Sequence, residues 1–123
     1  MRSSVVNATD LEITEAENES GKLVRLRGRL TIDSSPAFRD LLLAILRRQS
    51  PVAVLVDFSE VSYMDASGLA TLVEGLKIAR HRQSTLCLKG LEGRVLHLFE
   101  VTGLLTLFET SGCGSASSAA KVS

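Results

Sequence analysis

The sequence predicts an α/β domain with a mixed, mainly parallel sheet of about five strands and helices largely on one face. Two observations lead to this prediction. Segments with the two-residue period of strands alternate with segments whose apolar residues recur at helical spacing. A continuously apolar, β-branched run at 52–56 is typical of a strand covered on both sides. Strands that alternate with helices imply right-handed crossovers and therefore parallel pairing.

The first half of the chain is expected to form a hairpin and a helix. Residues 11–16 and 22–30 alternate apolar and polar side chains, and a turn at 18–21 would join them as an antiparallel pair. Residues 33–36 supply N-cap candidates and a proline suited to a first helical turn. Apolar residues at helical spacing then predict a helix that ends near Gln49.

The second half continues the alternation after the central strand. Residues 65–68 open a second helix, and residues 84–88 predict a short strand. A short helix closed by Gly103 and a last strand at 104–108 complete the expected order β-β-α-β-α-β-α-β.

The 123 residues correspond to one domain. We expect an N-terminal extension at 1–10, the folded domain at 11–109 and a disordered tail at 110–123. The tail is expected because it consists mostly of Ser, Gly and Ala, which cannot bury much apolar surface.

Composition narrows the classes of partner. The formal net charge of +0 argues against nucleic-acid binding through a large positive field. Neither a secretory signal nor an apolar stretch of membrane-spanning length is found, so we expect a cytoplasmic protein that does not insert into a membrane.

Cys87 is expected in the core and Cys113 in the tail. Reduced thiols are favoured, and a disulfide between them is the alternative.

Catalytic signals are missing from the pattern of residues. The sequence shows no Gly-rich phosphate loop, nucleophile elbow or carboxylate pair, and neither His81 nor His97 has the spacing of a metal site. We therefore expect no enzyme activity, no cofactor and no metal. A monomer or weak dimer is the expected state.

Two groups of cations allow a structural and a binding interpretation. Lys77, Arg80, His81 and Arg82 lie at a predicted helix end, where they would complement the helix dipole or receive an acidic partner. The alternate arginines at 25–29 indicate a solvated strand face or, alternatively, a docking patch.

The segment 56–70 has the pattern of a recognition loop. In open α/β sheets, ligands and partners dock at the loops after strand ends. Asp57 is expected to cap the end of the central strand, and Asp65 can accept a hydrogen bond from Ser67 or Gly68 as the N-cap of the next helix. Gly68 would permit close approach of another backbone. The alternative is that Asp65 is only a helix cap.

This segment resembles the signature of STAS domains, above all that of the anti-sigma factor antagonists. The resemblance rests on the run Val-Leu-Val-Asp-Phe-Ser-Glu-Val-Ser-Tyr-Met-Asp-Ala-Ser-Gly-Leu at 54–69 and on Val-Thr-Gly-Leu at 101–104, and it extends over roughly 11–108. It implies a domain that binds an anti-sigma factor which is also a serine kinase. That kinase modifies the Ser or Thr directly after the motif aspartate, and phosphorylation releases the partner.

At that position the sequence departs from the family. Ala66 follows Asp65 and has no hydroxyl, so the usual phospho-switch is not expected, and Ser67 is the possible phosphosite. The closing helix usual in the family is also not indicated after Phe108. The expected partner-binding residues are Asp57, Met64, Asp65, Ala66, Ser67, Gly68 and Leu69. The alternative function is that of a STAS subunit in a transporter ATPase complex or a signalling scaffold.

Overall fold

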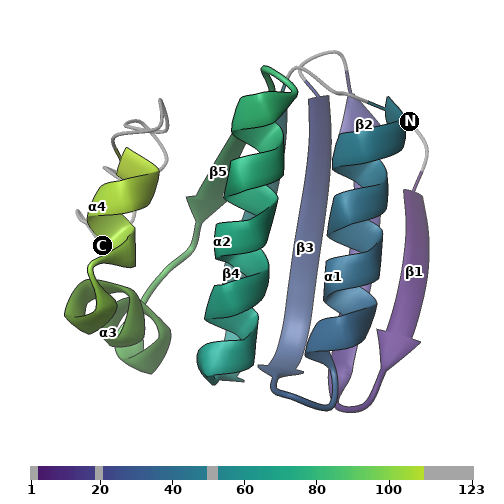
Figure 1. The fold of residues 1–123 in the computed structure, drawn as a ribbon. Helices are drawn as coiled ribbons and strands as arrows, with labels where there is room; N and C mark the ends of the chain where they lie inside the picture. Colours follow the sequence, from purple (N-terminus) through teal and green to yellow (C-terminus); the bar gives the residue numbers. More distant parts are fainter. Residues whose placement is uncertain (1–2, 19–20, 50–52, 110–123) are drawn as a thin grey trace.

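A computed structural model describes residues 3–18, 21–49 and 53–109. Five strands form one sheet in the order β1-β2-β3-β4-β5 (Figure 1). The strands are β1 (Ser3–Ala8), β2 (Leu11–Asn18), β3 (Gly21–Leu30), β4 (Ala53–Met64) and β5 (Thr85–Lys89). The helices are α1 (Ser35–Ala44), which continues into a π-helical turn (Ile45–Gln49), α2 (Ala66–His81), α3 (Gly93–Thr102) and α4 (Leu104–Glu109).

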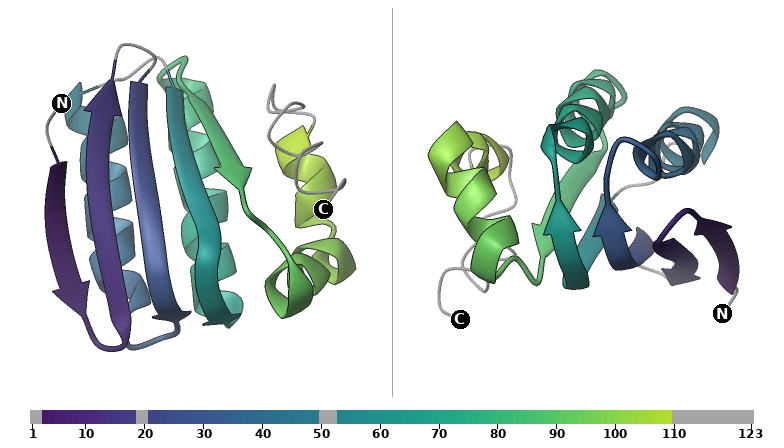
Figure 2. Two further views of the ribbon diagram at one scale, coloured as in Figure 1. Left: turned by 180° about the vertical axis from the view of Figure 1, so that it is seen from behind. Right: turned by 90° about the horizontal axis from the view of Figure 1, so that it is seen from below.

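The sheet is mixed, as predicted, but it is not mainly parallel, because the N-terminal strands add antiparallel pairs. The pairs β1–β2 and β2–β3 are antiparallel, whereas β3–β4 and β4–β5 are parallel. Helices α1 and α2 lie side by side on one face of the sheet, and α3 and α4 lie beyond its β5 edge (Figures 1 and 2). The prediction of helices largely on one face is therefore confirmed.

The hydrophobic core lies between the sheet and the α1–α2 layer. Alternate residues of β3, including Val24, Leu26 and Leu30, are fully buried under the helices. The intervening Arg25, Arg27 and Arg29 are exposed on the uncovered face. The period of two in β3 thus separates a buried side from a solvated one, as the sequence indicated.

Two predicted elements are wrong. Residues 104–108 are helical and not a strand, because the short apolar run also fits helical spacing. Phe108 is buried there, with its ring 6.4 Å from that of Phe99 in an edge-on arrangement. The last described element is thus the helix α4, and the expectation that no closing helix follows Phe108 falls almost entirely on residues outside the described ranges. The β4 strand also runs on to Met64, where a loop was expected after residue 56.

The N-terminal segment also differs from the expected extension. Residues 3–8 form β1 at the edge of the sheet, with Val6 opposite Ile13. The expected fifth strand at the C-terminus is thus replaced by one at the N-terminus. The predicted disordered tail at 110–123 lies outside the described residues.

Cys87 is not the small core residue that was expected. It is half-buried on β5, on the face opposite Leu86 and Leu88, because strand residues alternate between the two faces. It is disulfide-bonded, so the expectation of a reduced thiol is wrong at this position. Cys113 lies outside the described residues.

Candidate functional site

The candidate site lies where two parallel strands end at the same edge of the sheet. Leu30 of β3 and Met64 of β4 are paired in register, so the loop before α1 and the turn before α2 leave the sheet side by side. The Asp65 N–H donates to the carbonyl of Leu30 at 3.1 Å and joins the two turns. The N-terminal turns of α1 and α2 therefore share one surface.

Asp65 holds this surface together through both carboxylate oxygens. Its Oδ1 accepts the backbone N–H of Ser67 at 2.9 Å and also the Ser67 hydroxyl, which makes Asp65 the N-cap of α2 as predicted. Its Oδ2 accepts the N–H of Ile32 at 3.1 Å from the loop before α1. The Ser67 hydroxyl is the leading cause that lowers the pKa of Asp65, and the backbone donors add to it. Asp65 is thus a helix cap and also a link between two loops.

Ser67 connects the two helices. Its hydroxyl oxygen lies 2.8 Å from that of Ser35 in the first turn of α1. Because the Ser67 proton is directed to Asp65, Ser35 must donate in this pair. The Ser67 hydroxyl is therefore engaged both as a donor and as an acceptor.

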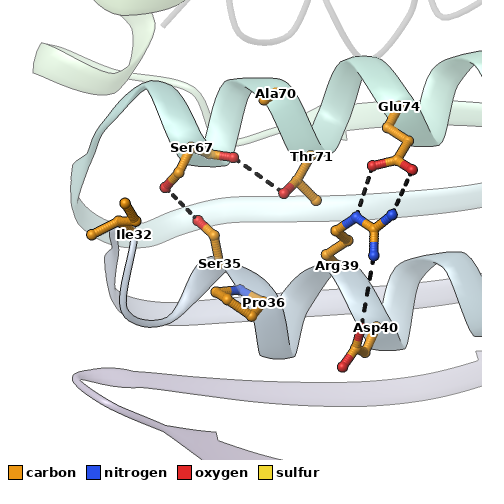
Figure 3. Close-up of a pocket in the computed structure, with 9 residues that line it drawn as sticks. All are labelled: Ile32, Ser35, Pro36, Arg39, Asp40, Ser67, Ala70, Thr71 and Glu74. Carbon is orange, nitrogen blue, oxygen red and sulfur yellow. Dashed lines mark hydrogen bonds and ion pairs between the residues drawn. The ribbon is translucent and has the colours of Figure 1, made fainter.

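A shallow groove of about 310 Å³ runs between α1 and α2 from this point (Figure 3). Its apolar floor and sides include Ile32, Pro36 and Ala70. Further along, the Arg39 guanidinium makes two hydrogen bonds to the Glu74 carboxylate, at 2.8 and 2.7 Å, across the groove. This fork lowers the pKa of Glu74 and raises that of Arg39. The groove is thus apolar at the sheet edge and charged at its other end.

The predicted site residues divide into two groups. Asp65 and Ser67 are partly exposed and Ala66 is exposed, so these three form a surface. Met64 and Leu69 are buried, and so is Gly68. The second group supports the surface from below.

Gly68 does not serve the purpose that the sequence suggested. A Cβ atom at this position would lie 2.8 Å from Leu30 Cδ2 and 3.1 Å from Met64 Cε. The close approach that Gly68 permits is therefore to the domain's own core. The expectation that it meets another backbone is corrected.

Asp57 lies apart from the other predicted residues. It is the fifth residue of β4, directly opposite Arg25 and Lys89 on neighbouring strands, and is 3% exposed. Burial raises the pKa of Asp57, but hydrogen bonds from Ser59, together with Lys89 and Arg25, outweigh it and hold the pKa below its usual value. Because β4 continues past it, Asp57 is an ion-pair partner within the sheet and not the cap of a strand end.

Sequence reasoning missed the residues that α1 and the loop before it contribute. Ile32, Ser35, Pro36 and Arg39 lie within eight positions of one another and reach the site because α1 packs beside α2. Ile32 is the most exposed large apolar residue of the described chain, at 72%. The parallel pairing of β3 with β4 is the signal that could have placed this loop next to Asp65.

The weaker candidates stay apart from this surface. His81 is exposed in the last turn of α2 and His97 is exposed on α3. Across the three described segments, no group of three His, Cys, Asp or Glu side chains could hold a metal ion. No helix in these segments is both long and apolar enough to cross a bilayer.

Comparison with known families identifies the domain. A family model described as "Mlab, STAS domain" matches residues 13–109. The chain belongs to the STAS-domain family. Curated STAS relatives include the anti-sigma-B factor antagonist of Listeria monocytogenes, 33% identical over 80% of this chain and 85% of that protein. That of Bacillus subtilis is 26% identical over 83% of this chain and 92% of the relative.

Solved structures share the STAS fold. An anti-sigma factor antagonist from Mycobacterium paratuberculosis superposes with a TM-score of 0.70 at 20% identity, covering 84% of this chain and 87% of the other. A second antagonist, described as putative, from Thermotoga maritima gives a TM-score of 0.64 at 17% identity, covering 73% and 77%. At these identities the likeness concerns the fold.

Proposed function

We propose that this STAS domain is an anti-sigma factor antagonist that binds an anti-sigma factor through the N-terminal turns of α1 and α2. The observation that carries the proposal is the exposed surface around Asp65, in which two loops are fixed to each other by one carboxylate. The curated relatives named as anti-sigma-B factor antagonists support the kind of partner.

The chemistry of the surface suits a protein partner. Ile32, Pro36, Ala66 and Ala70 are all exposed and present apolar area at the start of the groove. The Arg39–Glu74 pair lies further along at its rim. An apolar centre with a charged rim is the usual composition of a protein interface. A preorganised surface also binds at a lower entropic cost than a mobile loop.

The proposed antagonist is not switched by phosphate in the usual way. Ala66 is exposed where a kinase could reach it but offers no oxygen. Ser67, the remaining hydroxyl, is already bonded to Asp65 and Ser35. A phosphate on Ser67 would replace the proton that the hydroxyl donates to Asp65, and it would place about −1.5 to −2 charges beside the Asp65 carboxylate. We therefore infer that the domain is constitutively competent to bind.

A second candidate is a STAS subunit of a transporter ATPase complex or of a signalling scaffold. The lack of a hydroxyl at Ala66 favours it, because such a role needs no phosphate acceptor at that position. Both candidates are binding functions without catalysis, and they differ in the partner. If the protein is an anti-sigma factor antagonist, it would act in the cytoplasm. The Cys87 disulfide would be open to reduction there.

The test begins with affinity purification of the full chain from its own cells and mass spectrometry of what copurifies. The anti-sigma factor found there, or the kinase-like anti-sigma protein encoded in the same genome, is then titrated against the purified chain by calorimetry. We expect Ala66→Glu to weaken this binding at least about tenfold, a loss typical of an interface centre. An acidic residue in the first turn of α2 does not disfavour the helix, so folding is retained.

Val101→Glu is the matched control. Val101 is 63% exposed on α3, away from the groove, and should tolerate the same charge without loss of binding. Equal affinity of Ala66→Glu and wild type would reject this surface. Copurification with a transport ATPase, and no binding to the anti-sigma factor, would favour the second candidate.

A further inference from the structure

The two edges of the sheet are not equally protected. Beyond β5 the chain continues into α3 and α4, which lie beside that edge (Figure 2). β1 pairs with β2 on one side, and no other strand within the described segments pairs with its outer side. The outward backbone N–H and C=O groups of β1 therefore form an open ladder for another strand.

The composition of β1 lacks the usual protection of an open edge. Its six residues, Ser3–Ala8, include no charged side chain and no proline. Lysine, inward charges, proline and bulges are the common devices that prevent edge pairing. The pairing of β1 with β2 is continuous from 3 to 8, without a register shift. A regular strand of this length is close to the average for globular proteins.

Apolar side chains extend from both faces of this edge. Val5 is 54% and Val6 is 38% exposed. Because successive strand residues point to opposite faces, Val6 lies on the same face as its partner Ile13, under the helices, and Val5 on the open face. A neighbouring strand would cover both side chains as well as satisfy the backbone groups.

We propose that β1 pairs antiparallel with β1 of a second copy of this chain about a two-fold axis. Such pairing would join two five-stranded sheets into one. Each valine would then lie opposite an uncharged residue of β1 in the other copy. Two copies of this uncharged strand can lie opposite each other without charge repulsion. A two-fold contact also closes on itself and leaves no further β1 edge.

The proposed pairing leaves the candidate site accessible. The groove lies between α1 and α2, and α1 separates it from β1 (Figures 1 and 2). Each copy in the pair would therefore present its own groove.

The test is sedimentation velocity of the full chain from about 1 μM to about 1 mM, which brackets the Kd of weak to moderate complexes. We expect a reversible monomer–dimer equilibrium. Val5→Lys should raise the dimer Kd by at least about tenfold. Each lysine would lie at the β1–β1 contact without an acidic partner, or beside the same lysine of the other copy. Val101→Lys, the same change at an exposed position on α3, should leave the Kd unchanged.

Hydrogen exchange of the backbone amides identifies the surface used. Amides of 3–8 should gain protection as the concentration rises, whereas those of β5 should not. A chain that stays monomeric at every concentration would overturn the proposal. So would a dimer that forms without added protection in β1 or that Val5→Lys leaves intact.

Discussion

The hydroxyl of Ser35 lies 2.8 Å from that of Ser67 and joins the first turn of α1 to the first turn of α2. Ser35 is 4% exposed, so its hydroxyl has little access to water as a substitute partner. Because a buried polar group that loses its partner bears a desolvation cost, this pair should contribute measurably to stability.

Removing either hydroxyl should reveal this coupling. We expect Ser35→Ala to lower the free energy of unfolding by about 1 kcal/mol. Ser67→Ala should cost somewhat more, because the bond to Asp65 is also lost. The measurement is urea denaturation of both single variants and the double variant. A coupling energy of zero in this cycle would show that the two hydroxyls do not interact.

Asp65 should make folding depend on pH in a defined direction. The pKa of Asp65 is lowered in the folded state below the ordinary aspartate value, chiefly by the Ser67 hydroxyl. A lowered folded-state pKa gives stability that is fully present above the unfolded-state pKa and is lost as the pH falls through the folded-state pKa. Asp65→Asn cannot titrate and still caps a helix.

The stability of wild type and Asp65→Asn should therefore be compared from about pH 6 to about pH 2. The difference in unfolding free energy between the two proteins should stay constant down to the ordinary aspartate pKa. Below that pH, wild type should lose stability relative to Asp65→Asn. Parallel curves over the whole range would contradict the assigned hydrogen bonds. Asp57 and Glu74 also have lowered pKa values, but both proteins contain them, so their contributions cancel.

Gly68→Ala should destabilise the fold even though alanine favours helices. The helix preference would contribute about 1 kcal/mol. The new methyl would lie 2.8 Å from Leu30 Cδ2, and Leu30 is itself fully buried, so overpacking should cost about 1–3 kcal/mol. We expect a net loss of about 1 kcal/mol in chemical denaturation. Ala70→Gly, at an exposed position of the same helix, provides the reference for helix preference alone.

The Arg39–Glu74 ion pair should matter more to binding than to stability. Both side chains are more than a third exposed, and pairs of this kind contribute about 0.2–1 kcal/mol. Glu74→Gln should therefore change the unfolding free energy by less than about 1 kcal/mol. If the partner covers the groove, the freed arginine should change the association rate and its dependence on salt. Stopped-flow mixing at two ionic strengths measures this, and identical rates would place the partner elsewhere.

Ala66→Ser should create a phosphate acceptor. The side chain at this position is exposed, and serine is small enough to leave the first turn of α2 unchanged. Incubation of wild type, Ala66→Ser and Ser67→Ala with the partner kinase and ATP, followed by mapping of modified residues, should show phosphate at position 66 of the variant. Efficient modification of wild type at Ser67, with release of the partner, would contradict the constitutive reading.

The sequence predicted the elements whose periodicity is strong and failed where a short apolar run fits two structures. The alternation around Val24 and Leu26 and the helical spacing after Asp65 identified β3 and α2. The short apolar run at 104–108 fits strand and helical spacing equally well. Its helical state depends on the packing of Phe108 against Phe99. Strand β1 was missed because only Val5 and Val6 mark it in the sequence.

The candidate site was predicted in part for a similar reason. Local signals place Asp65 at a helix start, because a cap depends on residues two positions away. They do not place Ile32 beside it, since these two residues are 33 positions apart and meet only through the parallel pairing of β3 with β4. Nor do they separate Ala66 from Gly68, whose opposite burial follows from the direction each faces on α2.

That division along the first turns of α2 has a consequence for how the domain can diverge. Gly68 and Leu69 face the core, whereas Ala66 and Ala70 face solvent, so the residues that maintain the fold and those available to a partner are different sets. Substitutions at exposed positions away from structural features usually change stability by no more than about 0.5 kcal/mol. Partner choice can therefore change by mutation at the outward positions while the scaffold keeps its sequence, and a library randomised at residues 32, 66 and 70 should yield mostly folded proteins with altered binding.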